Sequence, residues 1–319
     1  MKRRAPTKIF PGCEALRKRL GAKAYDRRIA TEIEREEEFY AIISSKFTFF
    51  KLHLVRPLQR LALKCLGLYA KGRNELLSPV VVENEVHFGN KLPVEFDGFR
   101  IMHLSDLHID IDDDLEEAIA QVLMSHNYDL CVMTGDFRNK TVGTYDKTVS
   151  LMLKLRKAVK TEAYLVLGNH DYLGMVPELE QGGYRFLLKE SVGISRGESS
   201  IFLGGIDDPV IFHTDDIPGS FAGTPRTALK ILLGHSPRVY RRAEASGVDF
   251  LLCGHTHGGQ VCLPGGRALV GNDSSPKAFH KGSWRFGKLQ GYTTVGAGAS
   301  GLPIRLNCPP ELVIHTLRR

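Results

Sequence analysis

Two histidines close an apolar run in the segment LLCGHTHGGQ, which spans residues 251–260. His255 and His257 are separated by one residue, and residues i and i+2 of extended backbone point to the same side. Imidazole nitrogens are common metal ligands and also exchange protons near neutral pH. The flanking glycines allow the backbone to turn close to a bound ion. The segment therefore has the residue types and the spacing of a metal site or an acid–base site.

Polar side chains follow four other apolar runs in the same way. Asp106 and His108 follow IMHL, Asp136 follows CVMT, Asn169, His170 and Asp171 follow LVL, and His235 follows ILL. Open α/β sheets bind ligands at the carboxyl ends of their strands. If each apolar run is a strand, these side chains meet at one edge.

The potential ligands are too many for a single metal ion. A tetrahedral site takes about four ligands, whereas Asp106, His108, Asp136, Asn169, His235, His255 and His257 offer more. The pattern predicts two ions that share a bridging carboxylate. Asp136 is the natural bridge because it stands alone after its strand. Imidazole and carboxylate together suit Zn, Mn, Fe or Ni better than Ca or Mg.

The elements that position these residues alternate between strand and helix from about residue 80 onward. Strands are expected over 99–106, 129–136, 163–171, 201–207, 228–235 and 249–255, and helices over 114–126, 145–159, 176–181 and 237–246. The alternation predicts the α/β class with a central sheet. The segments GYTTVGAG and ELVIHTLRR near the end of the chain are predicted to be antiparallel strands.

The basic charge of the chain lies in its first quarter. Residues 1–80 contain 18 Lys and Arg against 8 Asp and Glu, while residues 81–319 contain 25 against 28. We therefore expect two parts, an N-terminal extension over 1–80 and a main domain over 81–319. A basic segment attracts polyanions, either nucleic acid or an anionic membrane. The charged stretch TEIEREEE within it is predicted to be a solvated helix.

An apolar stripe follows within the extension. Its members recur every three or four residues, with Lys51, Arg56, Arg60 and Lys64 between them; they are Phe47, Phe50, Leu54, Leu58, Leu61, Cys65 and Leu68. This is the pattern of an amphipathic helix with a basic polar face. Such a helix either docks on the catalytic domain or lies on an anionic membrane. No signal peptide is expected, because no apolar stretch follows the basic start, and no apolar run is long enough to predict a transmembrane helix.

The order of the polar blocks resembles that of a known family. The series SDLH, TGD, GNHD, GHS and GHTH is similar to the calcineurin-like metallophosphoesterases over about residues 95–319. CGHTHGGQ, with GYTTVGAGASGLPIRLNCPPEL after it, resembles the bacterial, often membrane-associated branch, which includes UDP-2,3-diacylglucosamine hydrolases. The resemblance implies a four-layer α/β/β/α sandwich, here with an N-terminal helical extension.

The resemblance also implies how the ligands divide between the ions. Asp106, His108, Asp136 and His257 would bind the first ion, and Asp136, Asn169, His235 and His255 the second. The cofactors expected are two divalent transition-metal ions, with Mn²⁺ as first choice and Zn²⁺, Fe²⁺ or Ni²⁺ as alternatives. Together they would lower the pKa of a bridging water, and the resulting hydroxide would attack phosphorus.

Three further residues are candidates around this centre. His170 is not a ligand in the family and is predicted to stabilise the transition state or protonate the leaving oxygen. Asp171 is predicted to orient the His170 ring. Arg138, two residues after Asp136, either holds a substrate phosphate or is a surface arginine paired with solvent.

Three functions are consistent with these features. The first is hydrolysis of a phosphodiester or pyrophosphate bond in an amphiphilic phosphate-ester substrate at the cytoplasmic membrane face. The second is a soluble nucleotide or nucleic-acid phosphodiesterase, although nucleic acid is not the expected partner. The third is a non-catalytic metal-binding scaffold, which the full ligand set disfavours. The six cysteines include no C-x-x-C pair, which predicts free thiols in a reducing compartment. We expect a cytoplasmic protein, either soluble or peripheral on the membrane.

Overall fold

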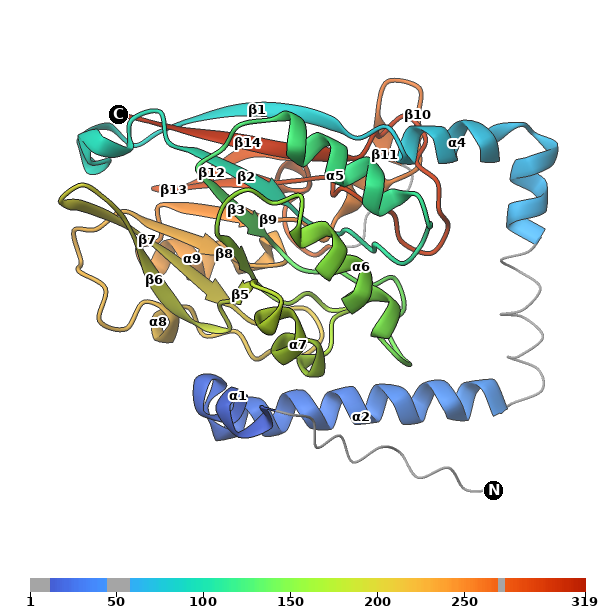
Figure 1. Ribbon diagram of the computed structural model, residues 1–319, viewed down its shortest axis with the longest axis horizontal. Helices are drawn as coiled ribbons and strands as arrows, with labels where there is room; N and C mark the ends of the chain where they lie inside the picture. The colour runs from blue at the N-terminus through green and yellow to red at the C-terminus, as the bar shows by residue number, and fades with distance from the viewer. Residues whose placement is uncertain (1–11, 45–57, 269–272) are drawn as a thin grey trace.

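Two six-stranded sheets form the centre of the molecule (Figure 1). The computed structural model describes residues 12–44, 58–268 and 273–319. The first sheet has the order β1 (Val80–His87), β14 (Glu311–Arg318), β2 (Arg100–Leu104), β3 (Leu130–Met133), β4 (Ala163–Leu165) and β5 (Arg185–Phe186). The second has the order β12 (Gly282–Phe286), β13 (Leu289–Thr293), β9 (Phe250–Cys253), β8 (Lys230–Leu233), β7 (Ser199–Ile206) and β6 (Lys189–Arg196). A small hairpin joins β10 (Cys262–Leu263) to β11 (Arg267–Ala268).

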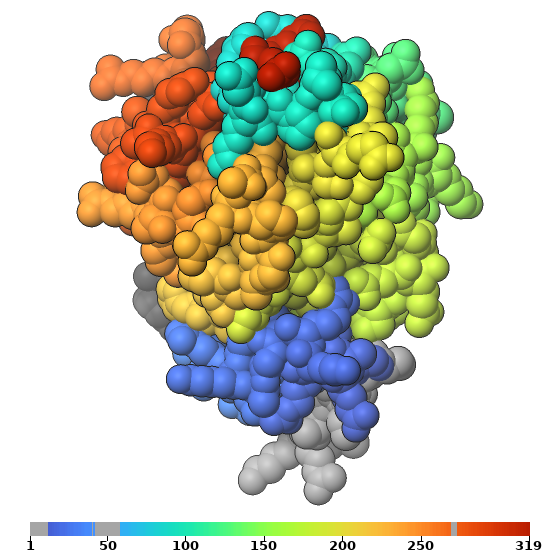
Figure 2. All heavy atoms as spheres, turned by 90° about the vertical axis from the view of Figure 1, so that its left-hand side faces the viewer, coloured from blue at the N-terminus to red at the C-terminus, as the bar shows by residue number. Residues whose placement is uncertain are grey.

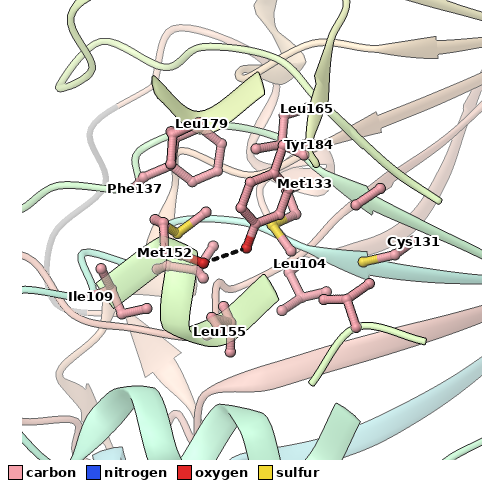
Figure 3. Packing of buried hydrophobic residues seen from close by; sticks show 14 of the residues in the cluster. Leu104, Ile109, Cys131, Met133, Phe137, Met152, Leu155, Leu165, Leu179 and Tyr184 are labelled. Atoms are coloured by element: carbon pink, nitrogen blue, oxygen red, sulfur yellow. Dashed lines mark hydrogen bonds between the residues drawn. The ribbon is translucent and has the colours of Figure 1, made fainter. Parts of the chain in front are cut away.

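The strands are buried on both faces because their side chains alternate between two cores. In β3, Cys131 and Met133 belong to the core between the first sheet and its helices, which is drawn in Figure 3. Leu130 and Val132 belong to the core between the two sheets. This alternation explains why β3 is a continuous apolar run rather than an alternating one.

Helices cover the outer face of each sheet. The first sheet is covered by α5 (Leu115–Ser125), α6 (Asp146–Arg156) and α7 (Val176–Gln181). On the second sheet lie α8 (Ile217–Ser220) and α9 (Tyr240–Ala245), which close a third core. The layers are therefore helix, sheet, sheet, helix, which is the predicted sandwich.

The single central sheet expected from the strand and helix pattern is wrong. β2, β3 and β4 pair in parallel in the first sheet, while β8 and β9 pair in parallel in the second. The two strands near the end of the chain also belong to different sheets: β13 pairs with β9 and β12, and β14 pairs with β1 and β2. The alternation of elements is the same whether successive strands enter one sheet or two, so it could not distinguish these arrangements.

The first helices of the extension pack on the catalytic body. These are α1 (Cys13–Leu20) and α2 (Ala22–Ser44), and Figure 2 shows this part of the chain, in blue, lying against the body. Leu16 and Leu20 of α1 join the core beneath the first sheet, and Arg19 forms ion pairs with Glu180 and Glu190. The predicted helix over TEIEREEE is confirmed as part of α2, but its predicted exposure to solvent is wrong, because Glu32 and Glu36 are buried.

The second part of the extension is more exposed. Residues 58–65 are helical, and α4 (Leu68–Leu76) follows them. Leu58 and Leu61 are each 57% exposed, and Leu66 is 70% exposed. The predicted stripe members Phe47, Phe50 and Leu54 lie outside the described residues. Among the helices that are described, none has the length and apolar character needed to cross a membrane.

Candidate metal centre

The predicted ligands lie on the loops that follow β2, β3, β4, β8 and β9. Five of the eight described non-glycine residues with positive φ are in this set: Asp106, His108, Asp136, His255 and His257. A positive φ brings the β-carbon of an ordinary residue close to the following carbonyl oxygen, which costs about 1–2 kcal/mol. Such strain persists only where the surrounding structure enforces it, and it gathers at functional sites.

One group of ligand atoms surrounds His257. Its Nε2 lies 3.2 Å from Nε2 of His108 and 3.4 Å from Oδ1 of Asp106. Nε2 of His108 lies 3.8 Å from Oδ2 of Asp136. Asp106, His108 and His257 together could hold a metal ion.

A second group surrounds His235. Its Nε2 lies 3.1 Å from Oδ1 of Asn169, 3.1 Å from Nδ1 of His255 and 3.3 Å from Oδ2 of Asp136. Asp136, His235 and His255 together could hold a metal ion. The same carboxylate oxygen, Oδ2 of Asp136, thus faces both groups, as a bridging ligand would.

The donor set fits transition-metal ions. Ligand atoms about 2.1 Å from a tetrahedral ion lie roughly 3.4 Å from one another, which is close to the separations observed here. Oδ1 of Asp106 is buried without a hydrogen-bond partner in the described structure. His108 donates from Nδ1 to the carbonyl of Arg138, and His235 donates from Nδ1 to the carbonyl of Thr134. These bonds fix each ring and leave Nε2 available for a metal.

The electrostatics differ among the histidines of the site: His108 and His255 are held neutral, whereas His235 is held protonated beside Asp136. Burial lowers the pKa of His108 to about 3 and that of His255 to about 4. Burial alone would raise the pKa of Asp136, but the charges of His235 and His170 hold it well below its usual value. Burial would likewise lower the pKa of His235, but Asp136 and Asp106 raise it to about 10. The carboxylates therefore favour a positive charge between them, whether an imidazolium or a cation.

The comparisons with known proteins agree with this geometry. The calcineurin-like phosphoesterase family matches residues 99–259. The chain belongs to this family. It is a metal-dependent phosphoesterase, and five strands from two sheets deliver its candidate ligands.

Named relatives match most of the catalytic body. The uncharacterized metallophosphoesterase YkuE of Bacillus subtilis is 28% identical over 261 residues, which cover 77% of this chain and 89% of the relative. Phosphodiesterase YaeI of Escherichia coli is 30% identical over 237 residues, covering 69% of this chain and 82% of the relative. The solved structure of TT1561 from Thermus thermophilus is 11% identical, covers 63% of this chain and 90% of that one, and has a TM-score of 0.44.

The role predicted for Asp171 is wrong. Its buried carboxylate accepts hydrogen bonds from the backbone amides of Asp136 at 2.7 Å, Phe137 at 2.8 Å and Gly168 at 2.9 Å. His170 instead donates from Nδ1 to the carbonyl of Asn139 at 2.8 Å. Asp171 therefore joins the loops after β3 and β4, and the carbonyl of Asn139 orients the His170 ring.

Arg138 is not a surface residue. Its side chain is fully buried, and Nη2 donates to the carbonyls of Val142 and Gly143. The guanidinium lies 4.4 Å from the centre of the Tyr172 ring. The solvent-paired interpretation is therefore wrong, and the role in binding a substrate phosphate remains a prediction.

Two residues near the centre were missed in the sequence. Arg305 is fully buried and donates to the carbonyls of Val295, Gly298 and His257, which holds the loop after β9 against the segment between β13 and β14. The buried carboxylate of Asp273 lies 3.9 Å from Nε2 of His255. Neither residue follows a strand-end block, so no local pattern indicated it.

Proposed function

We propose that the protein hydrolyses a phosphodiester or pyrophosphate bond in an amphiphilic substrate at the cytoplasmic face of a membrane. The proposed reaction is supported mainly by the two groups of ligand atoms that lie on either side of Asp136. Asp106, His108, Asp136 and His257 would hold one divalent ion, and Asp136, Asn169, His235 and His255 the other. Two such ions would lower the pKa of a water molecule and offset the charge on the phosphate.

His170 is placed to act on the substrate. Its Nε2 lies 3.9 Å from Oδ2 of Asp136, and its side chain is partly exposed. The ring also lines a cavity of about 350 Å³. Since Nδ1 donates to the Asn139 carbonyl, Nε2 is the atom that can bond a substrate oxygen and, when protonated, deliver a proton to the leaving group.

The membrane part of the proposal is supported by the exposed leucines. Leu58, Leu61 and Leu66 are all more than half exposed, and Arg60 and Lys64 lie among them in the sequence. An apolar surface with basic neighbours suits an anionic bilayer, where each basic side chain contributes about 1 kcal/mol. The basic groups Arg19 and Arg28 are instead engaged by acidic residues of the protein, which leaves less of the extension's charge for nucleic acid.

A substrate panel tests the reaction. Mn²⁺-loaded protein would be assayed with UDP-2,3-diacylglucosamine, cyclic dinucleotides, a chromogenic diester and the matching monoester. We expect turnover of the diester and the lipid pyrophosphate, abolished by Asp136→Asn. Turnover of cyclic dinucleotides alone would favour a nucleotide phosphodiesterase. Loss of all turnover in protein that retains its metal would favour the non-catalytic scaffold.

Vesicle flotation tests the location. The full chain should float with anionic vesicles at low salt and less so at high salt, because exposed charges are screened over about 10 Å at moderate ionic strength. Leu58→Glu with Leu61→Glu should abolish flotation while leaving hydrolysis of a small soluble diester unchanged. The matched control is Met124→Glu, another exposed apolar residue on a helix of the catalytic body. Flotation that survives the leucine changes would contradict the proposal.

A further inference from the structure

One face of α2 carries a stripe of charged side chains directed at the catalytic body. Its members are spaced by four, three and one residues, which places them on one side of a helix; they are Arg28, Glu32, Arg35 and Glu36. Three of the four are buried. Buried charges are stable only when they are paired and hydrogen-bonded. The partners of this stripe therefore identify the surface on which α2 packs.

The partners belong to the loop that follows β4. Arg28 donates to the carbonyl of Asp171 at 2.8 Å, and Glu32 accepts from the backbone amide of Leu173 at 2.8 Å. Arg28 also lies 3.0 Å from the buried carboxylate of Asp207. This loop carries Asn169 and His170, so α2 is attached to the backbone of the metal centre itself.

Glu36 extends these contacts to the loop after β3. It accepts from the hydroxyl of Tyr172 at 2.8 Å and from the backbone amide of Gly143 at 2.7 Å. Gly143 lines the cavity beside His170, and so does Phe39, one turn farther along α2. α2 therefore contributes Phe39 to the lining of the cavity beside His170.

Arg35 differs from the rest of the stripe. It is half-buried, and Nη1 donates to the carbonyl of Asn169 at 2.7 Å. Within the described residues this carbonyl is its one hydrogen-bond acceptor. A guanidinium has five N–H donors in a rigid fork and stays charged in proteins, so one bond to Asn169 leaves donors for another acceptor.

The charge of Arg35 also suits the site. Burial lowers its pKa, while the nearby carboxylates of Asp136 and Asp208 act in the opposite direction. A fixed cation beside two metal ions would repel a metal but attract a phosphate. Arginine binds phosphate through two parallel N–H donors, which a backbone carbonyl does not use.

We propose that Arg35 binds the non-bridging oxygens of the substrate phosphate, so that α2 supplies part of the substrate site. The inference rests on the proposed phosphoesterase reaction. Its simplest rival is a positioning role, in which Arg35 acts only by holding the Asn169 carbonyl. The two roles differ in what is lost when the guanidinium is removed: phosphate affinity in the first, metal occupancy in the second.

Calorimetric titration of inorganic phosphate into the Mn²⁺-loaded full chain tests the inference. Arg35→Gln should weaken phosphate binding at least tenfold, which corresponds to about 1.4 kcal/mol. It should raise KM for a chromogenic diester by a similar factor, with kcat changed less than threefold and metal content unchanged. Arg35→Lys should recover part of the affinity, because it keeps the charge but not the fork. Arg27→Gln is the matched control, since Arg27 is an exposed arginine of the same helix.

Three results would overturn the inference. Phosphate that binds Arg35→Gln as tightly as the unchanged chain would show that the guanidinium is not a ligand. Loss of metal from Arg35→Gln would assign Arg35 to positioning Asn169. An equal loss of affinity in Arg27→Gln would indicate long-range charge only. Failure of the unchanged protein to hydrolyse any diester, with phosphate binding still dependent on Arg35, would contradict the proposed function and leave this inference standing.

Discussion

Replacing Asp171 with asparagine should destabilise the protein and weaken its metal centre. The carboxylate accepts two backbone amides at Oδ2, those of Asp136 and Gly168, and one at Oδ1, that of Phe137. An asparagine has one acceptor oxygen, so its amide group must face at least one of these N–H donors. A lost hydrogen bond to a charged group costs about 1.5–3 kcal/mol, and an unsatisfied buried N–H adds about 1–3 kcal/mol. We expect a loss of about 3 kcal/mol or more.

Urea unfolding and elemental analysis of the same samples measure both effects. The free energy of unfolding should fall by the amount above. Metal content should fall with it, because the backbone of Asp136 loses one of its supports. Turnover would then be lost through the metal centre rather than through His170.

The matched control is Asp113→Asn. The side chain of Asp113 is 87% exposed and pairs with Lys147, and surface pairs of this kind contribute about 0–1 kcal/mol. If Asp171→Asn costs less than about 1 kcal/mol and keeps its metal while turnover collapses, the bridging role would be refuted. The alternative in which Asp171 acts through His170 would then be favoured.

Three other changes have expected outcomes. Asp136→Asn should reduce metal content from nearly two equivalents to less than one by elemental analysis, a larger loss than from any other single ligand, because Oδ2 of Asp136 faces both ligand groups. Arg28→Ala should lower the free energy of unfolding by about 3–5 kcal/mol, since the fully buried Asp207 loses its partner; a cost below 1 kcal/mol would contradict the docking of α2. The metal-free protein should lose stability as the pH falls below 6.5, because burial lowers the pKa of His103 to about 3 and that of His315 well below its usual value. At pH 5 these histidines are protonated in the unfolded state but not in the folded state, which lowers the free energy of unfolding by about 2 kcal/mol for His103 alone. Urea unfolding at pH 7 and at pH 5 measures this difference.

The catalytic strands and the candidate ligands could be predicted because their signals are local. Each of β2, β3, β4, β8 and β9 is a short apolar run, and each ligand follows within four residues of the strand. A strand that is buried on both faces must be a run of apolar residues. A ligand at the carboxyl end of such a strand needs only to be a polar residue shortly after the run. The assignment of these strands to two sheets came instead from the family resemblance, since nothing within a strand identifies its neighbours.

Roles that depend on distant backbone could not be predicted in this way. Asp171 lies next to His170 in the sequence, which suggested that one orients the other. In the fold, the backbone amides of the loop after β3 donate to the Asp171 carboxylate. The carboxylate is therefore bonded to these amides and not to the His170 ring. The burial of Arg138 has the same origin, since it depends on the Tyr172 ring and on carbonyls that the sequence pattern does not place.

The charged stripe of α2 shows the same limit. A helix rich in Glu and Arg is normally solvated, because burying such groups is costly without partners. Glu32 and Glu36 are nevertheless buried, because amide and hydroxyl donors of the loops around the metal centre reach them. The carboxylates of α2 accept hydrogen bonds from these loop donors, so the helix and the loops stabilise one another. The change of composition near residue 80 therefore marks a difference in charge, whereas the contacts of α2 make this helix a structural part of the metal centre.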